Sequence, residues 1–111
     1  MTIKSMTVIE LKEKLDQRDE FVLVDCRAQQ DWSFEHIEHS ISLPAMEIAQ
    51  KLEQVLTDKN APIIIQCWIG QTSMKVAHYL KDQGYTNLTN LEGGIMNWKN
   101  QGLPVMQGSN K

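Results

Sequence analysis

Short continuous runs of apolar residues alternate along the chain with stretches in which apolar residues recur at helical spacing. The clearest run is Ile63-Ile64-Ile65, which follows Ala61-Pro62 and predicts a short strand buried on both faces. The apolar run at residues 21–24 predicts a second strand of this kind. Weaker segments predict three more strands, at residues 3–6 (an edge strand), 41–43 and 86–91.

Between these runs, apolar residues lie three or four positions apart, as on one face of an amphipathic helix. Thr7-Val8-Ile9-Glu10 predicts where the first helix begins, because the side chains of Thr7 and Glu10 can each accept a hydrogen bond from the other's backbone amide. This helix is expected to end near residue 17. Four further helices are predicted: at residues 29–35, at 46–56 with Met46 on the apolar face, between Thr72 and Gly84, and at 95–101.

The alternation of strands and helices predicts the α/β class, with a largely parallel sheet and helices on both of its faces. Ligands of such sheets bind outside the carboxyl ends of the strands. Cys67 directly follows one predicted strand, and Asp25-Cys26-Arg27 follows another. We therefore expect a functional site at this edge of the sheet.

Length and composition set limits on the protein class. The 111 residues fit one domain, 1–111, and their net charge of −3 without a Lys/Arg cluster predicts neither nucleic-acid nor membrane partners. No apolar run is long enough to span a membrane, and residues 1–5 lack the apolar core of a signal peptide. Two cysteines without Cys-x-x-Cys spacing predict free thiols in a reducing compartment, by default the cytoplasm.

Cys67 is the candidate nucleophile. It begins a loop that connects a buried strand to the N-terminus of a helix, where free backbone N–H groups and the helix dipole favour an anion. A thiol in that position can have its pKa lowered from about 8.5 to roughly 3.5–7.5. The alternative is an inert, buried thiol. The convergence of strand, loop and helix on one residue favours the reactive interpretation.

Four segments, in order, resemble the single-domain rhodanese family over nearly the whole chain. They are Leu23-Val24-Asp25-Cys26-Arg27, Glu35-His36-Ile37, Cys67-x-x-Gly70-x-x-Ser73, and Leu91-Glu92-Gly93-Gly94-Ile95 with Trp98, Gly102, Leu103 and Pro104. The resemblance implies a five-stranded, mostly parallel sheet with flanking helices. It also implies that Cys67 carries sulfane sulfur as a persulfide.

The resemblance and the thiol chemistry together predict a rhodanese-type sulfurtransferase that needs no metal or organic cofactor. Cys67 would take sulfur from a donor such as thiosulfate and pass it to a thiol or cyanide, or to a protein acceptor such as a thioredoxin-like protein. The loop amides would hold the anions. The expected substrate-binding residues are Trp68, Ile69, Gly70, Gln71, Thr72 and Ser73.

The loop departs from the family in having no cation. Many relatives carry Arg at the positions of Trp68 and Thr72, so capture of the thiosulfate dianion should be weaker here. This departure keeps open a non-catalytic binding module, or a persulfide carrier that acts with a partner protein. A phosphatase or arsenate reductase is disfavoured, because that chemistry needs a longer loop with an arginine clamp.

Other polar and aromatic residues have a structural interpretation beside a functional one. Cys26 is either a resolving thiol for Cys67 or, as we favour, a small core residue. Asp25 and Arg27 are expected in a buried clamp in which Arg27 pairs with Asp31.

The histidines and tryptophans are also expected to have mainly structural roles. His36 is expected to be packed and hydrogen-bonded, Trp98 to lie in the core, and His39 and His78 to lie on the surface. Trp68 has no evident core to join, and would line the site or dock a protein acceptor.

Overall fold

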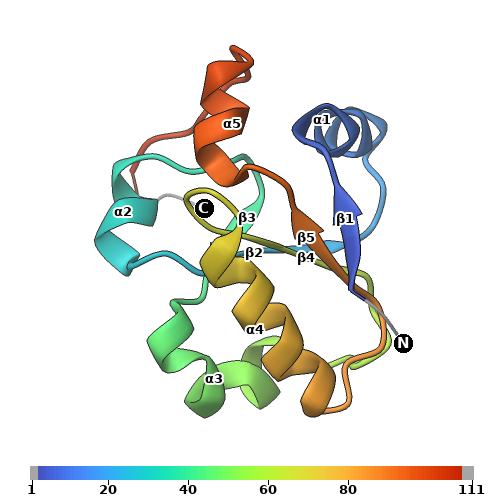
Figure 1. Ribbon diagram of the computed structural model, residues 1–111. Helices are drawn as coiled ribbons and strands as arrows, with labels where there is room; N and C mark the ends of the chain where they lie inside the picture. The colour runs from blue at the N-terminus through green and yellow to red at the C-terminus, as the bar shows by residue number, and fades with distance from the viewer. Residues whose placement is uncertain (1–2, 109–111) are drawn as a thin grey trace.

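The computed structural model describes residues 3–108, in which strands and helices alternate as the sequence predicts (Figure 1). The strands are β1 (Lys4–Met6), β2 (Val22–Asp25), β3 (Ser40–Ser42), β4 (Ile63–Gln66) and β5 (Leu88–Leu91). The helices are α1 (Val8–Gln17), α2 (Gln29–Phe34), α3 (Ile48–Val55), α4 (Gln71–Asp82) and α5 (Gly94–Asn100), with a 3₁₀ turn, η1 (Ala45–Glu47), before α3.

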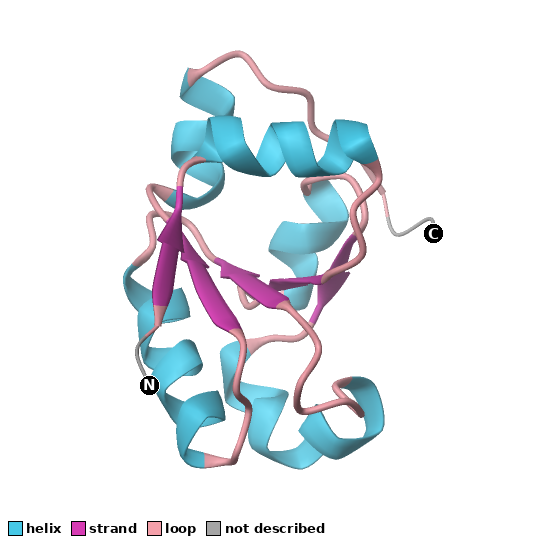
Figure 2. Cartoon of the chain, turned by 90° about the vertical axis from the view of Figure 1, so that its right-hand side faces the viewer, coloured by secondary structure: helices cyan, strands magenta, loops and turns pink. Residues whose placement is uncertain are grey.

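The strands form one parallel sheet in the order β1-β5-β4-β2-β3 (Figure 2). Strand β4 lies at its centre, between β5 and β2, which is why the three consecutive Ile residues are all buried. Strand β1 is at one edge, as predicted. The five-stranded parallel sheet of the α/β class is confirmed.

Helices cover both faces of the sheet and create two apolar cores. On one face α3 and α4 pack over side chains that include Ile63 and Ile65; on the other, α1 and α5 pack over side chains that include Ile64 (Figure 1). Because successive side chains of a strand point to opposite faces, one strand supplies both cores. The side chain of Cys67 belongs to the first core, two residues beyond Ile65.

The predicted start of α1 is confirmed. The Glu10 amide donates to the Thr7 hydroxyl at 3.1 Å, and the Thr7 amide donates to the Glu10 carboxylate at 2.9 Å. The predicted apolar role of Met46 is wrong, since its side chain is 95 % exposed. It lies in the tighter turn η1 rather than in the α-helix, so its side chain does not share the face that α3 buries. No helix within residues 3–108 is long and apolar enough to cross a membrane.

Candidate functional site

Cys67 is the first residue after β4, at the carboxyl end of the central strand, and its side chain is buried. Its Sγ accepts hydrogen bonds from the backbone amides of Gly70, at 3.1 Å, and Ser73, at 3.3 Å. Gly70 caps α4 with φ +102°, a left-handed conformation that glycine adopts without strain. The loop therefore curls around the sulfur and aims two backbone donors at it.

Asn90, in the interior of β5, bonds to the two residues whose amides contact the sulfur, and sequence reasoning missed it. The Ser73 hydroxyl lies 3.3 Å from the Cys67 Sγ and donates to the Asn90 Oδ1 at 2.5 Å, while the Asn90 side-chain amide donates to the Gly70 carbonyl at 3.2 Å. Asn90 is therefore a positioning residue for the two amides that contact sulfur. The sequence signal that could have identified Asn90 was an amide side chain inside a segment otherwise predicted to be a buried strand.

The N-terminus of α5 holds the beginning of the same loop. The amide of Ile95 donates to the Cys67 carbonyl at 2.9 Å, and the amide of Met96 donates to the Trp68 carbonyl at 3.0 Å. Gly94 permits this approach, because a Cβ there would lie 2.5 Å from the Cys67 carbonyl oxygen and would also overlap the Trp68 carbonyl. The Glu92-Gly93-Gly94 turn thus fixes the loop from the side opposite α4.

Hydrogen bonding makes Cys67 an unusually acidic thiol. Hydrogen bonding, first with the Cys26 thiol and then with the Ser73 side chain, the Ser73 amide and the Gly70 amide, lowers the pKa of Cys67 to about 4, against the opposing effect of burial. The positive end of the α4 dipole acts in the same direction. Near neutral pH, Cys67 is therefore a thiolate, the nucleophilic form of cysteine.

The lowered pKa predicts the pH at which this thiolate is lost. In the folded protein we expect Cys67 to stay ionised down to about pH 5 and to protonate around its pKa of about 4; on unfolding, its pKa should return toward 9.0. The measurement is the ultraviolet absorbance of the thiolate during an acid titration, taken as the difference between the wild type and Cys67→Ser. A midpoint near 8 in the folded protein would show that the loop does not stabilise the anion.

Cys26 is buried in the core, as the favoured interpretation predicts, and it also neighbours Cys67. The pKa of the Cys26 thiol is raised, first by its hydrogen bond with Cys67, then by burial and by the charge of Cys67. The two thiols therefore differ in protonation: Cys67 is ionised, and Cys26 remains a thiol that donates to it.

The remaining loop residues lie on the surface around the sulfur. Trp68 and Ile69 are 42 % and 54 % exposed, and Gln71 and Thr72 are also exposed. The Trp68 ring has a partner that the sequence did not reveal: the Arg27 guanidinium carbon lies 4.6 Å from its centroid. A cation thus lies under the loop, although the loop contributes none.

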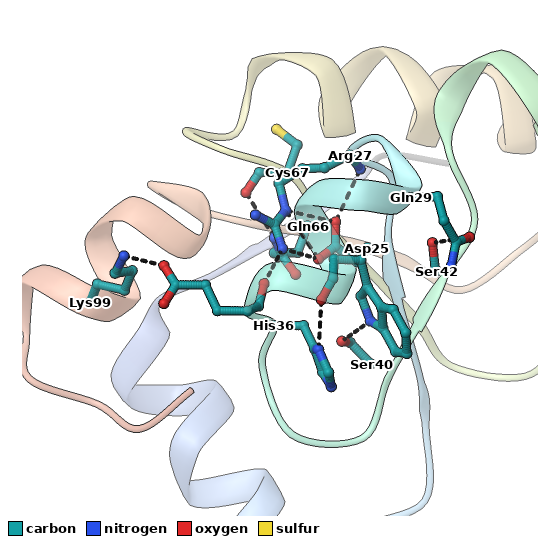
Figure 3. A network of polar contacts seen from close by, with 11 residues as sticks. Asp25, Arg27, Gln29, His36, Ser40, Ser42, Gln66, Cys67 and Lys99 are labelled. Carbon is teal, nitrogen blue, oxygen red and sulfur yellow. Dashed lines mark hydrogen bonds and ion pairs between the residues drawn. The ribbon is translucent and has the colours of Figure 1, made fainter. Parts of the chain in front are cut away.

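The charge of Arg27 is already paired. Its guanidinium donates to the Asp25 carboxylate, with a shortest distance of 2.7 Å, and to the Glu35 carbonyl at 2.7 Å (Figure 3). The buried clamp is confirmed, but the predicted partner Asp31 is wrong. The Arg27 side chain turns inward and pairs with the Asp25 carboxylate instead. Figure 3 shows this network beneath Cys67, whose sulfur points away from it. We conclude that the clamp supports the loop and leaves no strong positive charge beside the sulfur.

The histidines and Trp98 lie where the sequence predicts. His36 is buried, stacks on Trp32 and has its Nδ1 2.8 Å from the Trp32 carbonyl oxygen. His39 and His78 are exposed, and Trp98 is buried in the second core. These four residues thus have no part in the contacts around Cys67.

Comparisons with known proteins agree with this geometry. The Rhodanese-like domain family matches residues 7–101. The chain is 32% identical over 104 residues to YtwF of Bacillus subtilis, covering 94% of this chain and 98% of that protein. It is 31% identical over 99 residues to the thiosulfate sulfurtransferase GlpE of Coxiella burnetii, covering 89% of this chain and 90% of the relative.

A solved structure supports the same assignment. The crystal structure of a rhodanese-like domain protein from Staphylococcus aureus is 31% identical, superposes with a TM-score of 0.81, and covers 95% of this chain and 100% of that one. The fold and the cysteine loop at the carboxyl edge of a parallel sheet define the class, an α/β domain with a buried, acidic thiol at that edge. The chain belongs to the rhodanese-like domain family.

Proposed function

We propose that this chain is a sulfurtransferase that moves sulfane sulfur through a persulfide on Cys67. The observation that carries the proposal is the Cys67 sulfur itself, held by the amides of Gly70 and Ser73 and ionised near neutral pH. The name of the GlpE relative, thiosulfate sulfurtransferase, supports the same chemistry. As in the sequence interpretation, we take the whole chain, 1–111, as one domain that works in a reducing compartment, the cytoplasm.

The reaction would run in two halves. The Cys67 thiolate attacks the outer sulfur of a donor such as thiosulfate, an S–S bond forms, and sulfite leaves with the electron pair of the broken bond. The persulfide is again an anion, which the amides of Gly70 and Ser73 can stabilise. A thiol or cyanide then attacks the outer sulfur and releases the Cys67 thiolate. The chain's own groups suffice for each of these steps.

The kinetic pattern tests this scheme. Because one product leaves before the acceptor reacts, initial rates at several fixed cyanide concentrations should give parallel double-reciprocal lines for thiosulfate. Lines that intersect would show that donor and acceptor react in one complex, without a persulfide. A folded protein that neither catalyses sulfur transfer nor takes up sulfur from thiosulfate would instead support the alternative function, a non-catalytic binding module.

Exposed apolar residues beside the sulfur favour a protein acceptor as a second possibility. Trp68, Ile69 and Met96 are each between 42 % and 54 % exposed, and the Met96 amide bonds to the Trp68 carbonyl. Exposed aromatic side chains are frequent anchors in protein interfaces. A thioredoxin-like protein with a reactive thiol would fit such a surface, and the chain would then serve as a persulfide carrier.

A new cation in the loop should improve the use of thiosulfate. Thr72→Arg adds a charge at an exposed site in the first turn of α4, close to the amides that hold the sulfur. A charge-assisted hydrogen bond contributes about 1.5–3 kcal/mol where water is partly excluded, so we expect KM for thiosulfate to fall by roughly tenfold with little change in kcat. The gain should shrink as ionic strength rises.

Thr72→Gln is the matched control, since it adds length without charge. Trp68→Arg is less suitable, because it would remove the ring that packs on Arg27 and would place two guanidinium groups together. An unchanged KM in folded Thr72→Arg would mean that loop charge does not limit thiosulfate capture.

A further inference from the structure

Cys26 and Cys67 occupy equivalent positions just beyond the carboxyl ends of two adjacent strands. Asp25 of β2 pairs with Gln66 of β4, and each cysteine directly follows the end of its strand. The pairing continues past the strand ends, because the Cys26 amide donates to the Gln66 carbonyl at 2.9 Å. Side chains one residue beyond a paired register point to the same face, and both cysteines indeed lie in the first core.

This placement meets the geometric requirement of a disulfide. Adjacent strands lie about 4.7–4.9 Å apart, and disulfides join residues whose Cα atoms are about 4.4–6.8 Å apart. The Cys26 side chain is also near enough to Cys67 to be the first cause of its lowered pKa. A bond between Cys26 and Cys67 therefore requires rotation of two side chains and no movement of the sheet.

Because Cys67 is buried, the two sulfur atoms of its persulfide are accessible to different partners. The Cys67 side chain is only 3 % exposed, so an external acceptor meets the outer sulfur first. Cys26, also 3 % exposed, lies in the same core as the inner sulfur, the Cys67 Sγ, and next to it in the strand register. An internal thiol and an external acceptor would thus attack different sulfurs.

We propose that Cys26 acts as an internal acceptor that converts the Cys67 persulfide into a Cys26–Cys67 disulfide and releases sulfide. The inference rests on the proposed persulfide. Cys26 Sγ bonds to Cys67 Sγ, the bond between the Cys67 Sγ and the outer sulfur breaks, and the outer sulfur leaves with that electron pair and the Cys26 proton, as HS⁻. The outer sulfur is reduced and Cys26 is oxidised, so atoms and charge balance.

The Cys26 thiol should become a better nucleophile once Cys67 carries a persulfide. Its pKa is raised chiefly by the hydrogen bond with Cys67, with burial and the charge of Cys67 adding to the shift. In the persulfide the negative charge moves to the outer sulfur, which weakens the hydrogen bond and the repulsion that depend on a Cys67 thiolate. A low-molecular-weight thiol or a dithiol protein then reduces the disulfide and restores both cysteines. The net activity is the reduction of sulfane sulfur to sulfide at the expense of external thiols.

One experiment compares the wild type with Cys26→Val, which removes the thiol while nearly keeping its volume. Each protein is incubated anaerobically with thiosulfate alone; sulfite and sulfide are counted, and the intact chain and its Cys67 peptide are weighed. We expect both proteins to release one sulfite per chain. The wild type should also release one sulfide and lose the mass of two hydrogens, with peptides 26 and 67 joined. Cys26→Val should keep one added sulfur and release no sulfide.

The outcomes separate this inference from the proposed function. The inference would be overturned if the wild type, like Cys26→Val, kept its added sulfur and released no sulfide. The proposed persulfide on Cys67 would then still stand. Absence of sulfite from every protein would overturn the proposed function, and the inference with it. Cys26→Ala, checked for folding by circular dichroism, replaces Cys26→Val if the larger side chain disturbs the core.

Discussion

Cys67→Ser is expected to abolish sulfur transfer while the protein remains folded. A serine hydroxyl has the size to accept the hydrogen bonds of the Gly70 and Ser73 amides, but it is not ionised near neutral pH and cannot carry sulfane sulfur. We expect the rate of thiocyanate formation from thiosulfate and cyanide to fall by more than roughly 10³-fold. Circular dichroism and urea unfolding would verify that the fold is kept.

A suitable comparison is Cys26→Val, which changes the neighbouring thiol in the same core. An external acceptor attacks the outer sulfur of the persulfide, and the Gly70 and Ser73 amides still hold the Cys67 sulfur, so this variant should still transfer sulfur to cyanide. Loss of the Cys26 hydrogen bond should raise the pKa of Cys67 and shift this activity toward higher pH. Turnover in folded Cys67→Ser at more than a trace of the wild-type rate would show that Cys67 is not the nucleophile.

Gly94→Ala is expected to disable the site from the opposite side and to weaken the fold. Gly94 has φ +58°, and its added Cβ would lie 2.5 Å from the Cys67 carbonyl oxygen and overlap the Trp68 carbonyl. Left-handed strain and overpacking together should cost roughly 2–4 kcal/mol of unfolding free energy. The loop carbonyls would also lose their bonds to the Ile95 and Met96 amides, so activity should fall with stability.

Gly102→Ala provides the matched control. Gly102 also has a positive φ, +75°, but no atom lies within 4 Å of its added Cβ. The unfolding free energy of Gly102→Ala should fall only by the roughly 1–2 kcal/mol that left-handed strain costs, and the variant should keep its activity. Equal losses of stability and activity in the two variants, measured by urea unfolding and thiocyanate formation, would mean that close packing of α5 on the loop does not matter.

The fold could be predicted largely because local patterns and the tertiary structure agree. The run Ile63–Ile65 is continuous because β4 is covered on both faces, and the pair Thr7 and Glu10 sets the first helix boundary by local hydrogen bonds alone. Met46 was misplaced because a helical spacing does not distinguish an α-helix from a 3₁₀ turn that precedes it.

The site was predictable only as far as it is local in sequence. Cys67 and Gly70 belong to one loop, so a strand, a loop and a helix start were enough to identify them. The contacts of Asn90 and the stacking of Trp68 on Arg27 join distant segments, and they depend on strand order and side-chain direction, which periodicity does not give. The strand register is likewise what places Cys26 beside Cys67.

The most direct test of the central claim is the sulfite released by the protein from thiosulfate in the absence of any acceptor. Sulfite appears when Cys67 takes the outer sulfur, whether the persulfide then persists or is resolved by Cys26. At saturating thiosulfate, we predict one sulfite per chain from the wild type and none from folded Cys67→Ser. Equal sulfite from the two proteins, or none from the wild type, would contradict a persulfide on Cys67.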